Sequence, residues 1–315
     1  MDLHKELTKF LKTSKKPLIV ILGPTASGKT ELSLKVAKDF DGEIISVDSR
    51  QIYKGLEIGS DVLPENKRKK IPHYLLEITT PDKPISMAEF ARMAREKITD
   101  IHERGKVPML VGGTGLYISA LTEAYDLPPV PPDEKLRTRL TKKAAEKGKE
   151  AVHKELQKLD PQAAEQIHPN NLRYVIRAIE ICKACKGKRP RKKSKPPYEI
   201  YFIGIQRPRE ELYERIEKRV YIQIKKGLLE EVKALLKKGY DPYLPAMASL
   251  GVKEIIPHLQ DDVPLEECLD TLKKNTRNFA KRQMTWFRKY DNVNWLKPSE
   301  VEKCLKKATK KTSKR

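Results

Sequence analysis

Hydrophobic residues gather in short continuous runs that predict the strands of a buried sheet. Residues 17–22 are apolar throughout and are followed by glycine, which is typical of a strand covered on both faces. Residues 43–47, 107–111 and 199–205 also have strand character. Because helices usually pack on both sides of a parallel sheet, these runs favour parallel pairing.

Helical periodicity occupies the intervals between the apolar runs. Residues 31–40 show a short helical pattern, and residues 87–104 predict a helix with Ser86 as its N-cap and Gly105 after its end. A long amphipathic helix is expected over residues 212–238. This alternation favours a doubly wound α/β sheet, in which ligands bind at the carboxyl ends of the strands.

A proline cluster at residues 127–132 interrupts the alternation, since neither a helix nor a central strand tolerates it. Residues 133–186 are then helix-like and strongly charged, and residues 186–197 form a basic run with prolines. We therefore expect a helical insert within the sheet domain. The predicted parts are a core of residues 17–126 and 199–300, an insert at 127–198 and a basic tail at 301–315.

The charge of the chain indicates a polyanionic partner. Its 315 residues include 65 Lys and Arg against 43 Asp and Glu, a formal net charge of +22. Neutralising phosphates releases condensed counterions, so a basic protein of this kind favours nucleic acid. The alternative is a lysine-rich surface that only keeps the protein hydrated, as in thermophile proteins.

Cysteine usage and the N-terminal segment predict a cytoplasmic protein without a structural metal. Cys182 and Cys185 form a single C-x-x-C, and no second pair lies at zinc-site spacing. Their spacing on an apolar-patterned segment favours packing, and four cysteines in all fit a reducing cytosol. Residues 1–16 carry charges every few residues, so we expect neither a signal peptide nor a membrane span.

A complete phosphate-binding motif follows the first apolar run. The sequence Gly23-Pro24-Thr25-Ala26-Ser27-Gly28-Lys29-Thr30 matches G-x-x-x-x-G-K-[ST] between a strand and a helix. The backbone N–H groups of such a loop cradle phosphate oxygens, Lys29 adds a positive charge, and the Thr30 hydroxyl can ligate Mg²⁺. We therefore expect a P-loop NTPase-like parallel sheet core, with a ligand that the loop alone does not identify.

An acidic residue follows the second strand rather than the third. An ordinary P-loop kinase would hold Mg²⁺ with an acid after a strand such as residues 107–111, but glycines 112 and 113 stand there. Asp48 instead follows residues 43–47, at the same sheet edge as the glycine loop. It could order Mg²⁺ through water or act as a general base, although an Asp-Ser pair after a strand is commonly a helix cap.

Four runs in order along the chain resemble the tRNA dimethylallyltransferase family, also called tRNA isopentenyltransferases. Each run is weak on its own, and together they are specific. They are Gly23 to Thr30, Asp48-Ser49-x-Gln51-x-Tyr53-x-Gly55 with Ile58-Gly59, Val111-Gly112-Gly113-Thr114-x-Leu116-Tyr117, and Thr276-Arg277-x-x-Ala280-Lys281-Arg282-Gln283-x-Thr285-Trp286.

The resemblance implies a prenyl transfer. In such an enzyme the P-loop binds dimethylallyl diphosphate, and the prenyl group passes to N6 of the adenosine 3′-adjacent to the anticodon, in tRNAs that read codons starting with U. The product is N6-isopentenyladenosine. Asp48 then takes the position of the general base. The departing pyrophosphate would be stabilised by Lys29, by Thr30 with Mg²⁺, and by Arg219. The alternative for Arg219 is an ordinary solvated arginine on a helix.

The resemblance also implies the tRNA contacts, because the target base must leave its stack to be reached. Thr114 would lie beside the target nucleotide; the alternative is that it only forms a turn at the end of a strand. Trp286 would stack on a base; the alternative is that it is a core residue. The implied tRNA-binding residues are Asp48, Ser49, Arg50, Gln51, Thr114, Arg137, Arg173, Tyr174, Val175, Ile176, Arg177, Ala248, Ser249, Leu250, Gly251, Val252, Lys253, Lys281, Arg282, Gln283, Trp286 and Arg288.

Two positions depart from the family pattern. The usual Gln-Arg pair of the insert is Arg173-Tyr174 here, and the usual tyrosine after Gly251 is Val252. Base recognition is expected to differ in detail. The zinc finger of eukaryotic relatives is absent, which is typical of a bacterial enzyme, and a monomer is expected.

Two other functions remain as alternatives. A P-loop small-molecule kinase would bind ATP in the same loop and would have no need of tRNA. A non-catalytic basic RNA-binding protein would leave the complete P-loop motif unexplained.

Overall fold

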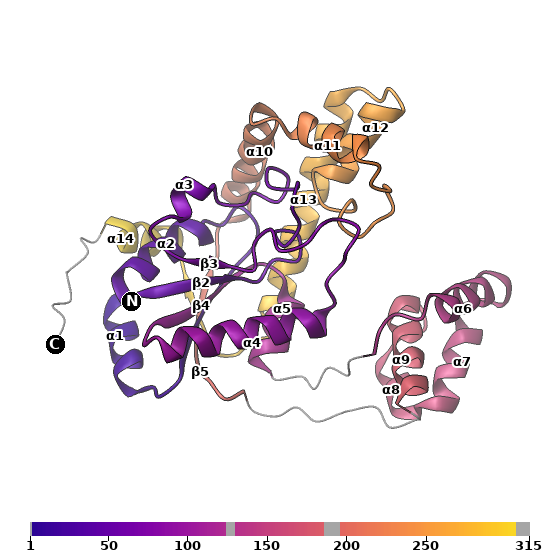
Figure 1. The fold of residues 1–315 in the computed structure, drawn as a ribbon, viewed down its shortest axis with the longest axis horizontal. Coiled ribbons are helices and arrows are strands. Elements are labelled where there is room, and N and C mark those ends of the chain that lie inside the picture. The colour runs from indigo at the N-terminus through magenta and orange to yellow at the C-terminus, as the bar shows by residue number, and fades with distance from the viewer. Residues whose placement is uncertain (1, 124–129, 186–195, 307–315) are drawn as a thin grey trace. The chain divides into compact units, whose positions relative to one another are not determined.

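The computed structural model describes residues 2–123, 130–185 and 196–306 (Figure 1). The chain divides into two compact units, one of residues 1–123 with 195–315 and one of residues 124–194. The second unit overlaps the insert expected at residues 127–198. Each unit has its own hydrophobic core.

The first unit contains a six-stranded sheet in which every neighbouring pair is parallel, as the apolar runs predicted. Its order is β3-β2-β4-β1-β5-β6. The central strand β1 therefore lies between β4 and β5, and β2 is one strand further away. The strands are β1 (Pro17–Leu22), β2 (Gly42–Ser46), β3 (His73–Tyr74), β4 (Val107–Gly112), β5 (Glu199–Ile205) and β6 (Val293–Leu296).

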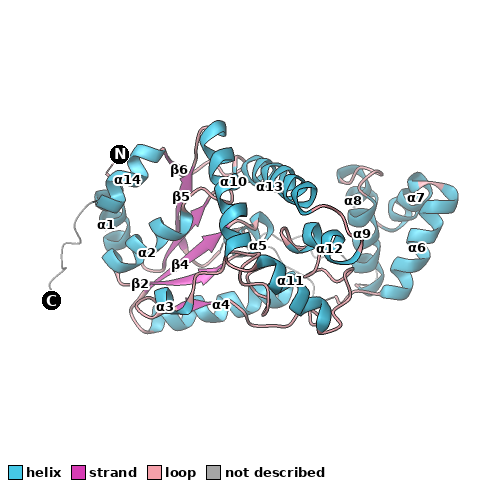
Figure 2. Ribbon diagram, turned by 90° about the horizontal axis from the view of Figure 1, so that it is seen from above, coloured by secondary structure: helices cyan, strands magenta, loops and turns pink. Residues whose placement is uncertain are grey.

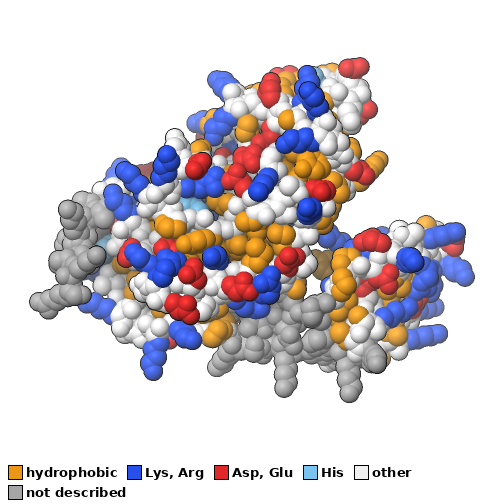
Figure 3. Space-filling model, in the orientation of Figure 1, with side chains coloured by type: hydrophobic (Ala, Val, Ile, Leu, Met, Phe, Trp, Pro, Cys, Tyr) orange, Lys and Arg blue, Asp and Glu red, His pale blue; other side chains and the backbone are white. Residues whose placement is uncertain are grey.

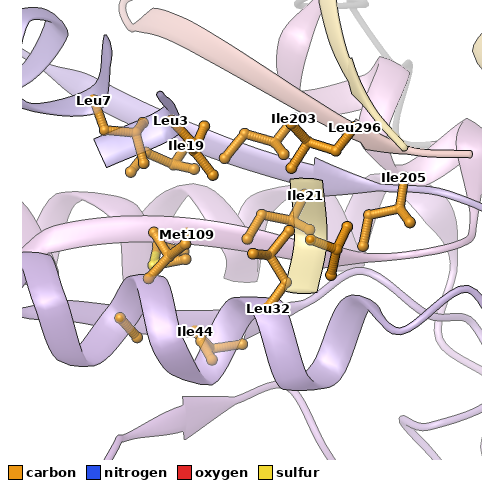
Figure 4. Close-up of a cluster of buried hydrophobic side chains, with 13 residues drawn as sticks. Leu3, Leu7, Ile19, Ile21, Leu32, Ile44, Met109, Ile203, Ile205 and Leu296 are labelled. Carbon is orange, nitrogen blue, oxygen red and sulfur yellow. The ribbon is translucent and has the colours of Figure 1, made fainter. Parts of the chain in front are cut away.

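One face of the sheet packs against three helices: α1 (Leu3–Thr13), α2 (Lys29–Phe40) and α14 (Pro298–Lys306). Figure 2 shows these helices together on one side of the strands. Alternate strand residues point into this layer, because successive side chains of a strand face opposite ways. Figure 4 shows Ile19, Ile21 and Ile203 in the resulting cluster with Leu32 of α2.

The other face of the sheet is covered by α4 (Met87–Glu103), which packs against α5 (Gly115–Thr122). The helix predicted at residues 87–104 is thus confirmed. The Ser86 hydroxyl accepts a hydrogen bond from the Glu89 N–H at 3.2 Å, as an N-cap does. Phe90, Ala94 and Ile98 form its buried side.

The long helix expected over residues 212–238 is wrong, because two helices occupy this segment. They are α10 (Arg209–Lys225) and α11 (Leu228–Lys237), separated at Gly227. Gly227 has a φ of 97°, a left-handed conformation that glycine adopts readily and other residues rarely do. The apolar pattern continues across the break, so the periodicity alone did not locate it.

The remaining elements of the first unit are α3 (Glu65–Arg68), α12 (Val252–Gln260) and α13 (Leu265–Phe287). Helix α13 packs against α10 and α12. The beginning of the predicted basic tail is also helical, since residues 301–306 belong to α14 and Val301 is buried. Residues 307–315 of that tail lie outside the described residues.

The second unit consists of four helices in its described part, residues 130–185. They are α6 (Glu134–Lys147), α7 (Lys149–Leu159), α8 (Pro161–Gln166) and α9 (Leu172–Ala184). Leu140, Val152, Leu156 and Val175 are among the side chains of their common core. Cys182 is buried on α9, where its thiol donates to Asp160 Oδ2 at 3.8 Å, which agrees with a packing role. None of the helices in the described ranges is long and apolar enough to cross a membrane.

Candidate active site

Four loops meet at the carboxyl ends of the parallel strands. The P-loop follows β1, and because β1 lies between β4 and β5, the segments after those strands flank it. The loop with Asp48 follows β2, the next strand beyond β4. The sheet order therefore brings the glycine loop and Asp48 to one edge, as the sequence predicted.

The P-loop conformation depends on its glycines. Gly28 has a φ of 101°, which disfavours any side chain, and α2 begins directly after it at Lys29. A Cβ on Gly23 would lie 2.9 Å from the Ile205 carbonyl oxygen. The loop is thus pressed against the end of β5, and its backbone turns into the N-terminus of α2, where N–H groups favour an anion.

Lys29 points back along the P-loop. Its ammonium donates hydrogen bonds to the carbonyl oxygens of Gly23 at 3.0 Å and Pro24 at 2.8 Å. Burial lowers the pKa of Lys29 to about 8, and the carboxylate of Asp48 acts in the opposite direction. Lys29 and Asp48 are therefore close enough to share one electrostatic environment.

Three arginines, one just after β5 and two on α10, bind successive residues of the P-loop. Arg219 Nη1 donates to Thr25 Oγ1 at 2.7 Å, and this arginine is the one that the resemblance implied. Arg215 Nε donates to the Ala26 carbonyl at 2.7 Å, and Arg207 Nε donates to the Ser27 carbonyl at 2.7 Å. The loop thus has a cationic rim.

The sequence interpretation missed Arg207 and Arg215. A usable pattern was present, since Arg207 stands just after β5 at the same sheet edge and Arg215 lies one helical turn before Arg219. Arg207 also pairs with Glu211. Arg215 pairs with no carboxylate in the part of the chain that the structure describes.

Asp48 lies in a turn, not at a helix N-cap. Its Oδ1 accepts a hydrogen bond from the Arg50 N–H at 2.9 Å. The neighbouring Ser49 N–H donates to Thr114 Oγ1 at 3.0 Å, and the Thr114 N–H donates to the Val47 carbonyl at 3.1 Å. The loops after β2 and β4 are therefore tied together beside a half-buried carboxylate.

Gln51 connects the Asp48 loop to residues 56–61. Its Oε1 accepts from Ser46 Oγ at 2.9 Å, and its Nε2 donates to the Ser60 carbonyl at 3.2 Å. Asp61 in turn pairs with Arg219 at 3.5 Å. Gln51 thus has a structural role in addition to the tRNA contact that the resemblance implied.

A partly buried carboxylate binds the far side of this loop. Glu231 accepts hydrogen bonds from the N–H groups of Ile58 at 2.7 Å and Gly59 at 2.8 Å. Burial raises the pKa of Glu231 to about 7, and the two N–H donors counteract that rise. Gln223 Nε2 donates to the carbonyls of the same two residues, so this dipeptide is bound on both sides.

We expect the stability of the protein to depend on the protonation of Glu231. Because its pKa is raised on folding, the folded state takes up a proton as the pH falls below about 7, and the unfolded chain does so only near its ordinary value. This contribution is therefore full at low pH and is lost as the pH rises through about 7. Compared with a Glu231→Gln variant, the wild type should gain thermal stability between pH 8 and pH 5.5. Equal melting-temperature profiles for the two proteins would contradict this expectation.

The predicted contact helix at residues 281–288 is divided between exposed and buried positions. Lys281, Arg282 and Arg288 are exposed. Gln283 is 6% exposed, and both ends of its amide bind backbone groups. The Trp286 indole packs against Gly115, where a Cβ would lie 2.3 Å from the ring, but it is only partly buried and so is not a core residue.

The turn at residues 248–253 and helix α9 of the second unit are also divided between exposed and buried positions. Ser249, Gly251 and Val252 are buried, Leu250 is partly buried, and Ala248 and Lys253 are exposed. In the second unit, Arg173 and Tyr174 are exposed, whereas Val175 and Ile176 are buried. Burial thus separates the members of each predicted contact segment into interior and surface positions.

Arg137 and Arg177 bind an acidic partner within the second unit. Both pair with Glu180, whose side chain is fully buried, at 2.7 Å and 3.0 Å. Burial acts to raise the pKa of Glu180, yet the two guanidinium groups hold it below its ordinary value. Part of their charge is therefore already compensated. Of the basic run predicted at residues 186–197, residues 186–195 lie outside the described residues; Lys183 is described and is half-exposed.

The P-loop offers oxygen ligands that fit a small divalent cation. Ser27 Oγ is buried without a hydrogen-bond partner in the described chain, and Thr30 is exposed in the first turn of α2. Mg²⁺ is usually held by few protein oxygens together with phosphate and water. This set fits such an ion, whereas no cluster of three His, Cys, Asp or Glu occurs among the described residues.

On the face drawn in Figure 3, Lys and Arg side chains are spread over both units with Asp and Glu among them. The basic residues of this face are thus not gathered in one patch.

Comparisons with known proteins identify the family of the chain. A family model described as IPP transferase matches residues 51–290. The tRNA dimethylallyltransferase of Alkaliphilus oremlandii is 46% identical over 294 residues, covering 92% of this chain and 94% of the relative. That of Halothermothrix orenii is 47% identical over 284 residues, covering 89% and 87%.

Solved structures are similar as well. The full-length tRNA isopentenylpyrophosphate transferase of Bacillus halodurans is 40% identical, with a TM-score of 0.69 and coverage of 92% of this chain and 95% of that one. A eukaryotic dimethylallyltransferase described as acting on tRNA is 28% identical, with a TM-score of 0.77 and coverage of 90% and 74%.

Proposed function

Since the chain belongs to the IPP transferase family, we propose that it transfers a dimethylallyl group from dimethylallyl diphosphate to an adenosine of tRNA. The acceptor is N6 of the adenosine 3′-adjacent to the anticodon, in tRNAs that read codons starting with U, and the product is N6-isopentenyladenosine. The observation that carries the proposal is the cation-lined P-loop beside Asp48 at one sheet edge.

The P-loop suits a diphosphate leaving group. In the reaction a bond forms between N6 and the allylic carbon, the bond from that carbon to the diphosphate oxygen breaks, and its electron pair leaves with pyrophosphate. Lys29, Arg215 and Arg219 lie where that negative charge develops, and fixed charges of this kind lower the barrier without reorganisation. Mg²⁺, held by the Thr30 hydroxyl with the diphosphate, would add charge neutralisation there.

Asp48 suits the removal of the N6 proton. An exocyclic adenine amine is a poor nucleophile, and a positioned carboxylate takes its proton as the new bond forms. Thr114 and Ser49, which hold the Asp48 loop, lie beside it. Lys281, Arg282 and Arg288, three exposed basic members of the predicted contact set, suit phosphates of the tRNA.

The kinase alternative is less well supported. It would need an acid after β4, and that strand ends at Gly112 and continues into Gly113. The relatives that match most of the chain are tRNA dimethylallyltransferases. The RNA-binding alternative gives no role to the arginines on the P-loop.

One experiment separates the three functions. The protein is incubated with dimethylallyl diphosphate labelled in the prenyl group, or with ATP labelled in the γ-phosphate, each with and without tRNA. We expect label from the prenyl donor to enter tRNA, and only when Mg²⁺ is present. Label from ATP in a small molecule would support a kinase, and tRNA binding without any transfer would support a binding protein.

The basic run of the insert is expected to contribute to tRNA affinity. It comprises Lys183, Lys186, Lys188, Arg189, Arg191, Lys192, Lys193 and Lys195. Changing Lys188, Lys192 and Lys193 to Gln should raise the KM for tRNA and flatten the salt dependence of binding by roughly 0.7–0.9 in log–log slope per lost contact. The kcat at saturating tRNA should change little. An unchanged salt slope would show that this run is a solvated loop.

A further inference from the structure

Gln283 of α13 joins two loops of the active site. Its Oε1 accepts a hydrogen bond from the Thr25 N–H of the P-loop at 2.8 Å. Its Nε2 donates to the Gly113 carbonyl, in the loop after β4, at 2.9 Å. With 6% of its surface exposed, the amide is enclosed by the groups that it connects.

The loop after β4 is shaped to admit this bridge. A Cβ on Gly113 would lie 2.2 Å from Gln283 Nε2, a separation that no side chain permits. Two residues further on, Gly115 admits the Trp286 ring in the same way, and Trp286 lies one helical turn after Gln283. Because Gly113 and Gly115 have no side chains, the side chains of Gln283 and Trp286 on α13 lie directly against the backbone of this loop.

Each end of the bridge continues to a group of the proposed chemistry. At the end that faces the prenyl-donor site, Thr25 also accepts a hydrogen bond from Arg219. At the other end, which faces the site of the prenyl acceptor, Gly113 precedes Thr114. Thr114 accepts a hydrogen bond from the Ser49 N–H, beside Asp48. The side-chain amide of Gln283 therefore connects the diphosphate loop directly to the loop that holds Asp48 in place.

We propose that Gln283 is a positioning residue that sets the separation between the P-loop and the Asp48 loop and makes no contact with tRNA. This rests on the proposed function, in which the P-loop holds the prenyl donor and Asp48 faces the amine. The reacting atoms must come within about 3–3.5 Å of each other, and a misplacement of about 1 Å can cost roughly 10²-fold in rate. The tRNA contact expected for Gln283 from sequence then passes to its exposed neighbours.

The test replaces Gln283 by Met, which keeps the length of the side chain and removes both hydrogen bonds. With both substrates saturating, kcat should fall about 10–100-fold, while the KM for tRNA stays within about threefold of wild type. The matched control is Arg282→Gln, one residue earlier and exposed. It should show the reverse pattern, a higher KM for tRNA with kcat nearly unchanged.

Gly113→Ala breaks the same bridge from its other end and serves if Gln283→Met does not fold. The added methyl group displaces the amide of Gln283, so kcat should fall by a similar factor. In the double variant the second change should add little, because both act through one contact. Melting temperatures of all variants are measured, and rates are compared well below them.

The outcomes are separable. A raised KM for tRNA with unchanged kcat in Gln283→Met would overturn the proposal and make Gln283 a contact residue. A lowered melting temperature with wild-type kcat would reduce it to a structural role, and fully additive losses in the double variant would also contradict the bridge. Failure of the wild-type protein to prenylate tRNA would instead refute the proposed function itself.

Discussion

Replacing Asp48 by Asn is expected to lower kcat about 10²–10⁴-fold, the usual contribution of a general base. Asn has the shape of Asp and can still accept the hydrogen bond from the Arg50 N–H, so the turn should be preserved. It cannot take up the proton of the N6 amine at neutral pH. The affinities for tRNA and for the prenyl donor should remain close to wild type in binding measurements. Single-turnover rates should show the loss in the chemical step.

Asp41→Asn is a matched control for this variant. Asp41 precedes β2 at the opposite end of the strand, where it pairs with Lys106 on the surface. Its φ of 53° is a conformation that Asn also adopts readily. Asp41→Asn removes the same charge at the other end of β2 and should leave kcat unchanged. Wild-type turnover in Asp48→Asn would show that another group accepts the proton.

The second large effect is expected for Lys29→Met. Loss of a fixed charge that stabilises the leaving group should lower kcat/KM for the donor by roughly 10²–10³-fold. Inhibition by pyrophosphate should weaken with it, because the same ammonium would bind the product. The melting temperature should not fall, since burial already lowers the pKa of Lys29 to about 8 and therefore disfavours its charge in the folded protein.

Lys38→Met controls for the loss of one positive charge on the same helix, at an exposed position. It should retain wild-type kinetics for both substrates. If Lys29→Met keeps its affinity for the donor and for pyrophosphate, the P-loop is not the donor site.

The sequence was informative where the physics is local. A strand buried on both faces is apolar throughout, and a P-loop needs its glycines and lysine at fixed spacing, so both could be predicted from residues 17–30. The helix after Ser86 was predictable for the same reason, since cap and periodicity lie within one segment. The strand order was not, yet parallel strands alone sufficed to bring Asp48 and the P-loop to one edge.

What escaped prediction depends on contacts between distant segments. Gln283 stood in a motif with basic residues, and only the packing of α13 shows that its amide binds Thr25 and Gly113. Arg215 and Arg207 likewise act on P-loop carbonyls far away in sequence. Burial also divides motifs that the sequence treats as units, so that Arg173 is exposed and Val175 is not.

The pairing of β1 with β5 has a consequence for synthesis of the chain on the ribosome. Strand β1 is made near the start, but β5 follows only after the whole insert, and α13 emerges later still. Until then one edge of the central strand has no neighbour and can pair wrongly. The insert, whose described residues form α6 to α9, can fold earlier because its contacts are local. We therefore expect the nascent chain to acquire its insert before its active site, and to depend on chaperones during that interval.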